Sequence, residues 1–287
     1  MSSKVFLNNE LIDEEKAGVP VSDSSFLYGA GLFETMRSRN GTVFRLHDHL
    51  DRLFFSAEAL SISHSYEKPF IQDAISRVLQ ANELADARLR LTLTNGPLAE
   101  SEEERRPTLL ITAAGFQPYP PQYYKAGVMV VLCPFRANTT DPTYGHQTTS
   151  FLPRLLALNM AHQRRAAEAL WFTQDGRLAD GCLTSVFLVK NSVLQTPRAD
   201  SPALIDPAGK VVRELAAKQT LEMVEKDLTV SDLLDADEVF LTNATVEVLP
   251  VVSVERHTVG AGAVGPITQR LREGFVQTVE QECGRQS

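Results

Sequence analysis

The sequence contains little of what stabilises small secreted proteins or anchors membrane proteins. It has three cysteines and one tryptophan in 287 residues. The cysteines, Cys133, Cys182 and Cys283, are odd in number and lack metal-ligand spacing, so we expect reduced thiols and a cytoplasmic location. No window reaches the ~18 consecutive apolar residues of a membrane-spanning helix. The N-terminal MSSKVFLNNELIDEE also lacks the basic and apolar regions of a secretory signal.

Positive charge is also scarce. The chain has 28 Lys and Arg against 36 Asp and Glu, a formal net charge of −8. Nucleic-acid-binding domains carry a basic face, so we expect no nucleic-acid partner. No P-loop, zinc-finger spacing or GxSxG motif occurs, and we predict no metal site. The stretch 260–265 (GAGAVG) is similar to a phosphate loop but follows no strand of a βαβ unit, so we interpret it as a loop entering the last helix.

The remaining composition is that of an ordinary globular protein, and its length suits two domains. Apolar residues make up 43% and charged residues 22%. Three prolines in QPYPPQYY exclude a central strand there and mark the boundary. We therefore predict an N-terminal α+β domain over residues 1–116, a linker over 117–124 and a mixed domain over 125–287. Ligands favour the cleft between such domains.

Strict alternation and hairpin turns predict an antiparallel first domain. Asn40–Gly41 is a strong hairpin signal, and ARLRLTLTN alternates with one polar face. The predicted strands are 4–12 with a turn at Asn8–Asn9, 31–39, 42–46, 87–95 and 108–113. Helical spacing of apolar residues predicts helices over 47–62 and 68–82.

The second predicted domain mixes strands and helices. A helix is expected over 150–170, capped by Ser150, with one apolar face formed by Leu152, Leu155, Leu156, Met160 and Ala167. Further helices are predicted over 211–223 and 267–283. Strands are predicted over 127–134, 168–172, 185–190, 193–196, 238–242 and 248–254, with a turn at Asp175–Gly176.

Several short motifs, each weak alone, occur together in a recognisable order. Taken singly, His49 and Arg52 would fit a solvated helix face. In order along the chain they read Tyr28-Gly29-x-Gly31-x-Phe33-Glu34-Thr35, Leu46-x-x-His49-x-x-Arg52-Leu53, Thr148-Thr149-Ser150-Phe151-Leu152, Glu168-Ala169-Leu170, Asp180-Gly181, residues 236–243 (ADEVFLTN), Pro250-Val251 and Gly265-Pro266-Ile267-Thr268. This order resembles the fold-type IV pyridoxal-phosphate enzymes: branched-chain and D-amino-acid aminotransferases and aminodeoxychorismate lyase.

The resemblance covers nearly the whole chain and implies the architecture and chemistry of that family. The expected fold class is α+β, with a small N-terminal α/β sandwich and a larger C-terminal barrel-like domain. The family's lysine forms a Schiff base with pyridoxal 5'-phosphate and moves the Cα proton. A glutamate pairs with the ring nitrogen, and an arginine and a helix N-terminus hold the phosphate. The resemblance also implies a homodimer.

Two catalytic positions depart from the family pattern. The lysine should precede Thr148-Thr149-Ser150, where this chain has Gln147. A carboxamide can neither form a Schiff base nor abstract a proton. The glutamate is shortened to Asp180, which reaches one methylene less. Lys125 and Lys190 are the nearest lysines, and neither occupies a matching position.

The expected phosphate cup is weakened as well. Arg52 is kept, but Asp206, Pro207 and Ala208 stand at the helix N-terminus, and Ala244 replaces the usual hydroxyl residue. Pro207 has no N–H to donate, and Asp206 would repel a phosphate by roughly 4 kcal/mol at ~4 Å and an effective dielectric of ~20. A shift of a few residues in this loop is the alternative alignment.

Two hypotheses follow. In the first, the protein is a diverged member without ordinary transamination: a pseudoenzyme, a small-ligand binder or a lysine-free enzyme with a small anionic ligand. In the second, it is an active aminotransferase or aminodeoxychorismate lyase with a substitute lysine. The polar and aromatic residues expected to line the cleft, besides Arg52, Gln147 and Asp180, are Tyr28, Phe33, Glu34, His49 and His146.

Overall fold

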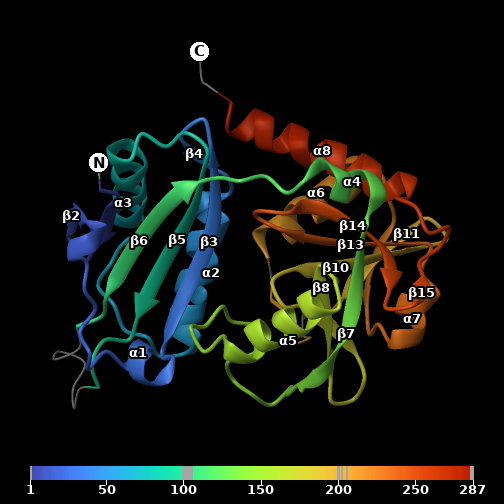
Figure 1. The fold of residues 1–287 in the computed structure, drawn as a ribbon, viewed down its shortest axis with the longest axis horizontal. Helices are drawn as coiled ribbons and strands as arrows, with labels where there is room; N and C mark the ends of the chain where they lie inside the picture. The colour runs from blue at the N-terminus through green and yellow to red at the C-terminus, as the bar shows by residue number, and fades with distance from the viewer. Residues whose placement is uncertain (1, 99–105, 199–200, 202, 205, 285–287) are drawn as a thin grey trace. The chain divides into compact units, whose positions relative to one another are not determined.

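The computed structural model describes residues 2–98, 106–198, 201, 203–204 and 206–284. It divides into two compact units (Figure 1). Unit 1 comprises Met1–Gln117, His146–Phe151 and Val279–Ser287, and unit 2 comprises Pro118–Gly145 and Leu152–Thr278. The chain thus changes unit close to the proline-rich stretch. Among the described residues no helix is long and apolar enough to cross a membrane.

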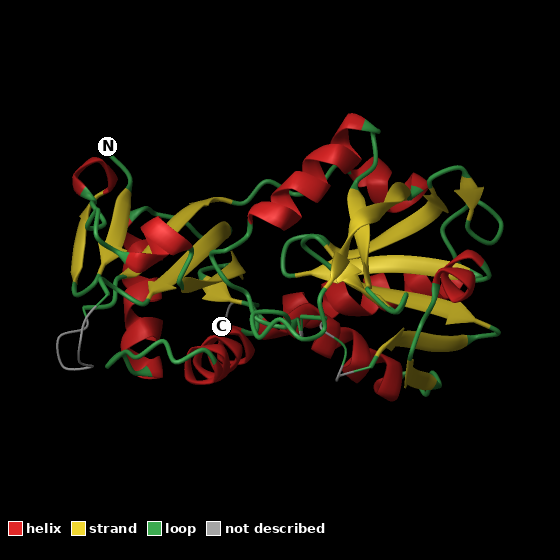
Figure 2. Ribbon diagram, turned by 90° about the horizontal axis from the view of Figure 1, so that it is seen from below, coloured by secondary structure: helices red, strands yellow, loops and turns green. Residues whose placement is uncertain are grey.

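Unit 1 is a six-stranded antiparallel sheet with two helices on one face (Figures 1 and 2). The strand order is β2-β1-β6-β5-β3-β4. Its elements are β1 (Lys4–Leu7), β2 (Glu10–Asp13), a 3₁₀ turn (Glu14–Lys16), α1 (Ser24–Tyr28), β3 (Gly31–Arg39), β4 (Thr42–Val43), α2 (Leu46–Ala59), α3 (Lys68–Ala81), β5 (Ala87–Thr94) and β6 (Leu109–Gly115).

Alternation along β3 and β5 decides which side of this sheet is covered. Leu32 and Met36 on β3 and Leu89, Leu91 and Leu93 on β5 point into a core closed by α2 and α3. Residues at odd positions of β3 and even positions of β5 lie on the opposite face, so β5 presents its two arginines there. The predicted polar face of this strand is confirmed.

Unit 2 is built around a nine-stranded mixed sheet, ordered β12-β11-β10-β13-β14-β7-β8-β9 with β15 beside β14. Pairs β11/β12, β14/β7 and β7/β8 are parallel. The elements are α4 (Pro121–Ala126), β7 (Val128–Ala137), α5 (Leu152–Gln163), β8 (Glu168–Thr173), β9 (Leu178–Gly181), β10 (Ser185–Lys190), β11 (Val193–Pro197), α6 (Pro207–Lys218), β12 (Met223–Lys226), α7 (Val230–Leu234), β13 (Glu238–Asn243), β14 (Glu247–Val254), β15 (His257–Thr258) and α8 (Pro266–Glu282).

Helix α5 corrects two expectations. It ends at Gln163, not at residue 170, because Arg165 adopts a left-handed φ of 61° and the N–H of Ala166 returns to the carbonyl of Ala161. The residues that pack on the sheet are Ala157 and Ala161. The predicted apolar face is instead open: the exposed fractions of its three leucines, Leu152, Leu155 and Leu156, are 76%, 47% and 48%.

Helix α6 begins earlier than predicted. Asp206 caps it by accepting the N–H of Gly209 at 3.3 Å, and Pro207 occupies the first turn, where its missing N–H costs nothing. Residue Met223, predicted as its end, begins β12. The short elements α1, α4, α7, β9, β12 and β15 were not predicted, and α4 takes up part of the expected linker.

Candidate functional site

Residues 146–151 lie along the start of β3 and fix the backbone of Gln147. The N–H of Phe33 donates to the Gln147 carbonyl at 2.9 Å, and the N–H of Thr149 donates to the Gly31 carbonyl at 2.8 Å. Leu32 and Thr148 form an antiparallel bridge. The backbone around position 147 is therefore tied to strand β3, and the side chain presented there is a carboxamide.

Three predicted residues of unit 1, Glu34, His49 and Arg52, form one buried cluster. Arg52 donates to Glu34 through Nε at 2.8 Å and Nη2 at 2.6 Å, and Nδ1 of His49 lies 2.7 Å from Oε2 of Glu34. Burial alone would raise the pKa of Glu34, but the Arg52 charge and the His49 hydrogen bond lower it below its ordinary value. The guanidinium fork expected at a phosphate is thus directed at a carboxylate of the same chain.

His146 belongs to unit 1 and contacts two residues of helix α2. Its Nδ1 lies 2.9 Å from the Ser56 hydroxyl, and its ring stacks on Phe55 at 5.9 Å between centroids. Burial lowers the pKa of His146, which favours the neutral ring. A neutral ring that shares a hydrogen bond with Ser56 can accept or relay a proton.

The other two residues predicted for the cleft differ in exposure. Phe33 is buried, with Phe151 edge-on at 5.3 Å and the Arg90 guanidinium 3.4 Å from its ring centroid. Tyr28 at the end of α1 is 67% exposed. Phe33 is therefore part of a packed aromatic and arginine group, whereas Tyr28 is a surface residue of unit 1.

Asp180 in unit 2 is held by Arg154, a residue that the sequence analysis did not single out. Arg154 donates through Nη1 to Oδ1 at 3.1 Å and through Nη2 to Oδ2 at 3.0 Å. Nη1 also donates to the Gly181 carbonyl at 2.6 Å. Burial alone would lower the pKa of Arg154, but the Asp180 charge raises it. The pair is a bidentate ion pair in which the carboxylate is buried and the guanidinium is partly exposed.

A second buried carboxylate organises the loop after Asp180. Glu168 accepts the N–H groups of Ala169 and Leu183, each at 3.0 Å, and the Thr184 hydroxyl at 3.2 Å. A Cβ at Gly181 would lie 2.3 Å from Oγ1 of Thr184, so this position requires glycine. Burial raises the pKa of Glu168. The loop geometry behind Asp180 is therefore rigidly defined.

The N-terminus of α6 is neutralised by its own cap. The Asp206 carboxylate occupies the end of the helix where an external anion would bind, and it accepts the Gly209 N–H. Ala208 and Ala244, the other expected cup positions, are both buried and carry no hydrogen-bonding side chain. The alignment of this loop with the family stays a prediction.

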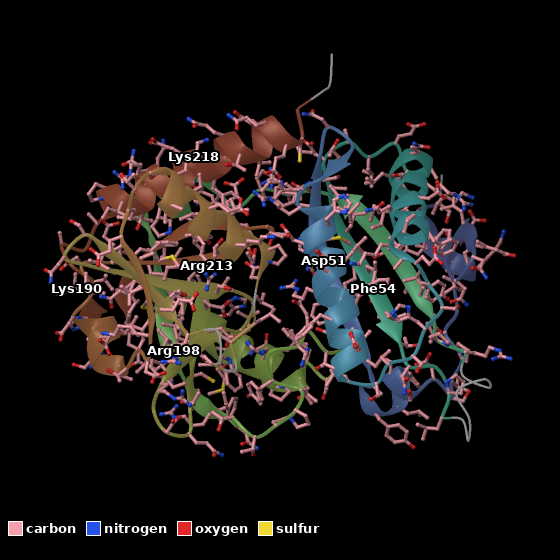
Figure 3. All side chains as sticks on the ribbon, turned by 180° about the vertical axis from the view of Figure 1, so that it is seen from behind. Asp51, Phe54, Lys190, Arg198, Arg213 and Lys218 are labelled. Atoms are coloured by element: carbon pink, nitrogen blue, oxygen red, sulfur yellow. The ribbon has the colours of Figure 1, made fainter. Side chains whose placement is uncertain are left out.

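The chain has eight lysines, and their surroundings bear on whether one could act in place of the lysine expected at position 147. None is buried. Lys190 donates to Asp235 and Asp237, and Figure 3 shows Lys190 and Lys218 on the periphery of unit 2. A Schiff-base lysine is normally desolvated so that its pKa falls. None of these lysines has that environment within its own unit.

Two further arginines missed by the sequence analysis line a groove of unit 1. Arg88 and Arg90 lie on the open face of β5, with Thr112 beside them on β6, around a groove of about 810 Å³. Burial and the neighbouring Arg88 charge lower the pKa of Arg90 to about 10. The alternation of ARLRLTLTN places both arginines on one face, so the signal was present in the sequence. Among the described residues no cluster of His, Cys, Asp and Glu could hold a metal ion.

Comparison with known proteins agrees with the motif order. Residues 31–254 match the family model of amino-transferase class IV. The chain is 33% identical over 276 residues to a protein of Methanocaldococcus jannaschii whose name assigns it provisionally to the branched-chain-amino-acid aminotransferases, with 95% of each chain covered. It is 28% identical over 287 residues to D-alanine aminotransferase of Listeria monocytogenes, with 98% of each covered.

The same architecture occurs in solved structures. The crystal structure of Escherichia coli branched-chain amino acid aminotransferase superposes with a TM-score of 0.92 at 25% identity, covering 100% of this chain and 97% of the other. The predicted α+β, fold-type IV architecture is confirmed by this match. On sequence and structure together, the chain belongs to the class IV aminotransferase family.

Proposed function

We propose that this protein retains the class IV fold but does not carry out Schiff-base transamination. It is a small-ligand-binding protein, either a pseudoenzyme or a lysine-free enzyme. The observation that carries the proposal is Gln147 at the position of the family lysine. Losing the lysine removes the nucleophile and the general base together, and general acid–base catalysis alone contributes typically about 10²–10⁴-fold.

The residues around the expected cofactor positions do not fit pyridoxal phosphate. Arg52 pairs with Glu34, and Asp180 pairs with Arg154. Asp206 adds a negative charge at the end of α6, and Pro207 has no N–H to donate. A phosphate dianion would meet a carboxylate where the family presents free donors. We therefore assign no step of any reaction to this cofactor.

The test is reduction of the protein after exposure to the cofactor. Purified protein is mixed with excess pyridoxal phosphate, desalted, treated with borohydride and analysed by mass spectrometry. We expect a colourless protein without a reduced adduct. A retained yellow band and an adduct on one lysine would overturn the proposal and show that a substitute lysine exists, and assays with amino donors and aminodeoxychorismate would then test the second hypothesis. Lys→Arg substitution at the modified residue would then abolish the band.

The proposed ligand is a small anion, and the support comes from Arg88 and Arg90. Among the described residues neither guanidinium forms an ion pair, although Arg90 interacts electrostatically with Glu34 and the groove is also lined by Glu14 and Glu83. Bidentate arginines are suited to carboxylate and phosphate groups. Titration with malonate and inorganic phosphate should show binding that Arg90→Gln weakens about tenfold or more. Arg77→Gln, which removes an exposed arginine of α3, should leave binding unchanged.

We also propose a homodimer, as is typical of the family. Leu152, Leu155 and Leu156 on α5 expose apolar surface in unit 2, and Phe26 and Leu27 on α1 do so in unit 1. Large exposed apolar residues in groups mark interaction surfaces. Light scattering should give twice the mass of 31.7 kDa. Leu155→Glu should shift the protein towards the monomer, and a monomeric wild type would contradict this part of the proposal.

A further inference from the structure

Arg154 and Asp180 both belong to unit 2 and form an ion pair that involves both oxygens of the carboxylate. Both carboxylate oxygens of Asp180 accept from Arg154, and the Leu204 N–H approaches Oδ2 at 3.4 Å. Arg154 is 18% exposed, and its partner carboxylate is almost fully buried. The guanidinium carbon also lies 5.5 Å from the Trp171 ring, a cation–π contact. Both oxygens of Asp180 are therefore occupied on the side that faces Arg154, where a second cation would have to bind.

The shorter side chain at position 180 is consistent with this pairing. An aspartate is one methylene shorter than the family's glutamate, so its carboxylate lies closer to the backbone. The Arg154 guanidinium reaches it and also the carbonyls of Gly181 and Cys182. A carboxylate holds one bidentate cation in this geometry, so a second cation would have to displace the first.

We propose that Arg154 is an internal counter-ion which takes the place of a cationic ring nitrogen at Asp180, so that the site accepts only ligands without a basic ring. This inference rests on the proposed function and adds the chemical class of ligand that unit 2 excludes. Arg154 acts here as a positioning residue, since it neutralises Asp180 and fixes the loop of residues 181–184. Removing its charge should return Asp180 to cation binding.

The probe for this proposal is pyridoxamine, which has a basic ring nitrogen but neither an aldehyde nor a phosphate. Its binding requires no lysine and no phosphate cup. Ligand-observed NMR compares it with 3-hydroxybenzylamine, which keeps the hydroxyl and the amine on a ring without nitrogen. We expect no detectable pyridoxamine binding by the wild type, and binding by Arg154→Met at least about tenfold above the detection limit, as for a charge-assisted hydrogen bond.

The controls isolate the carboxylate. The gain should disappear in Arg154→Met/Asp180→Asn and should be absent in Arg177→Met, which removes an arginine paired with Asp175. Equal pyridoxamine binding by wild type and Arg154→Met, at any level, would overturn the inference, and so would an equal gain for the nitrogen-free ring. Far-ultraviolet circular dichroism reports whether each variant is folded. If Arg154→Met does not fold, Arg154→Gln repeats the comparison, because its amide can still donate to the Gly181 carbonyl.

The borohydride experiment tests the proposed function, and the pyridoxamine experiment tests the inference about Asp180, so each can be overturned without the other. A Schiff base on a lysine of the wild type would overturn the proposed function. Pyridoxamine forms no Schiff base with the protein, so its binding tests only access to Asp180.

Discussion

The two units each bury an arginine–carboxylate pair, but they do so differently. In unit 1, Glu34 is bonded to both Arg52 and His49, so that loss of one partner leaves a hydrogen bond to the other. In unit 2, Asp180 has Arg154 as its bidentate partner. A buried charge with two partners tolerates the loss of one, whereas a closed pair does not. The cluster in unit 1 should therefore tolerate the loss of one partner better than the pair in unit 2.

The largest expected effect is the loss of the unit 2 pair. Arg154→Met leaves Asp180 buried without its cation and should lower the free energy of unfolding by about 3–5 kcal/mol. Arg52→Met should cost clearly less because His49 remains beside Glu34. Denaturant unfolding of unit 2 can be followed through Trp171, the one tryptophan of the chain. Arg154→Met/Asp180→Leu should regain most of the loss, and equal costs in the two units would contradict the comparison.

The buried carboxylates Glu34 and Glu168 should give the units opposite pH dependence. The pKa of Glu34 is lowered in the fold, so its stabilisation is present above its unfolded pKa and is lost as pH falls through the folded pKa. The pKa of Glu168 is raised, so its contribution is present below the unfolded pKa and is lost as pH rises through the folded pKa. The free energy of unfolding is measured between pH 3 and 8, roughly the window in which carboxylates titrate. Glu34→Gln should remove the part of the stability that the wild type loses as the pH falls. Glu168→Gln should remove the loss of stability that the wild type shows as the pH rises. If both variants changed the pH dependence in the same direction, the opposite roles of Glu34 and Glu168 would be refuted.

The cap of α6 should give a smaller effect. Asp206→Ala should lower the free energy of unfolding by about 0.5–2 kcal/mol, whereas Asp206→Ser keeps a capping oxygen and should cost less. Both variants remove the negative charge, so both should bind inorganic phosphate more tightly than the wild type. Calorimetric titration measures this directly. Unchanged phosphate binding in both variants would show that Asp206 is not what blocks the helix end.

The smallest effect concerns His146. Ser56→Ala removes its hydrogen-bond partner and should cost about 0.5–1.5 kcal/mol. The His146 pKa should stay below its ordinary value because burial is its cause. An NMR titration of the ring protons in wild type and variant checks both statements, and an ordinary pKa in the wild type would contradict the burial argument.

Local patterns predicted most of the elements, because alternation and helical spacing reflect which face is buried. The strands at β3 and β5 and the helices α2 and α3 follow these patterns closely. The pattern failed at α5, where leucines suggest a core face but the alanines make the contact. Apolar spacing reports that a helix has an apolar face and does not say whether its own chain or another covers it.

The site was predictable only where a motif contained the residue. Glu34, His49 and Arg52 were singled out, and the structure brings them together in unit 1. The pairing of Arg154 with Asp180 joins residues on α5 and β9, and no spacing rule relates them. Long-range ion pairs depend on the fold, so they could not be read from the sequence.

Under the proposed function, the ion pair of Arg154 and Asp180 also bears on how readily the chain could acquire Schiff-base chemistry. Restoring a lysine at position 147 would reinstate the nucleophile, but Asp180 would still be held by Arg154 and the α6 terminus by Asp206. Loss of Arg154 alone opens Asp180 to another cation but leaves a buried carboxylate without its counter-ion. Under the proposed function, a path to Schiff-base chemistry would therefore pass through a destabilised variant, and single substitutions would not readily reach it.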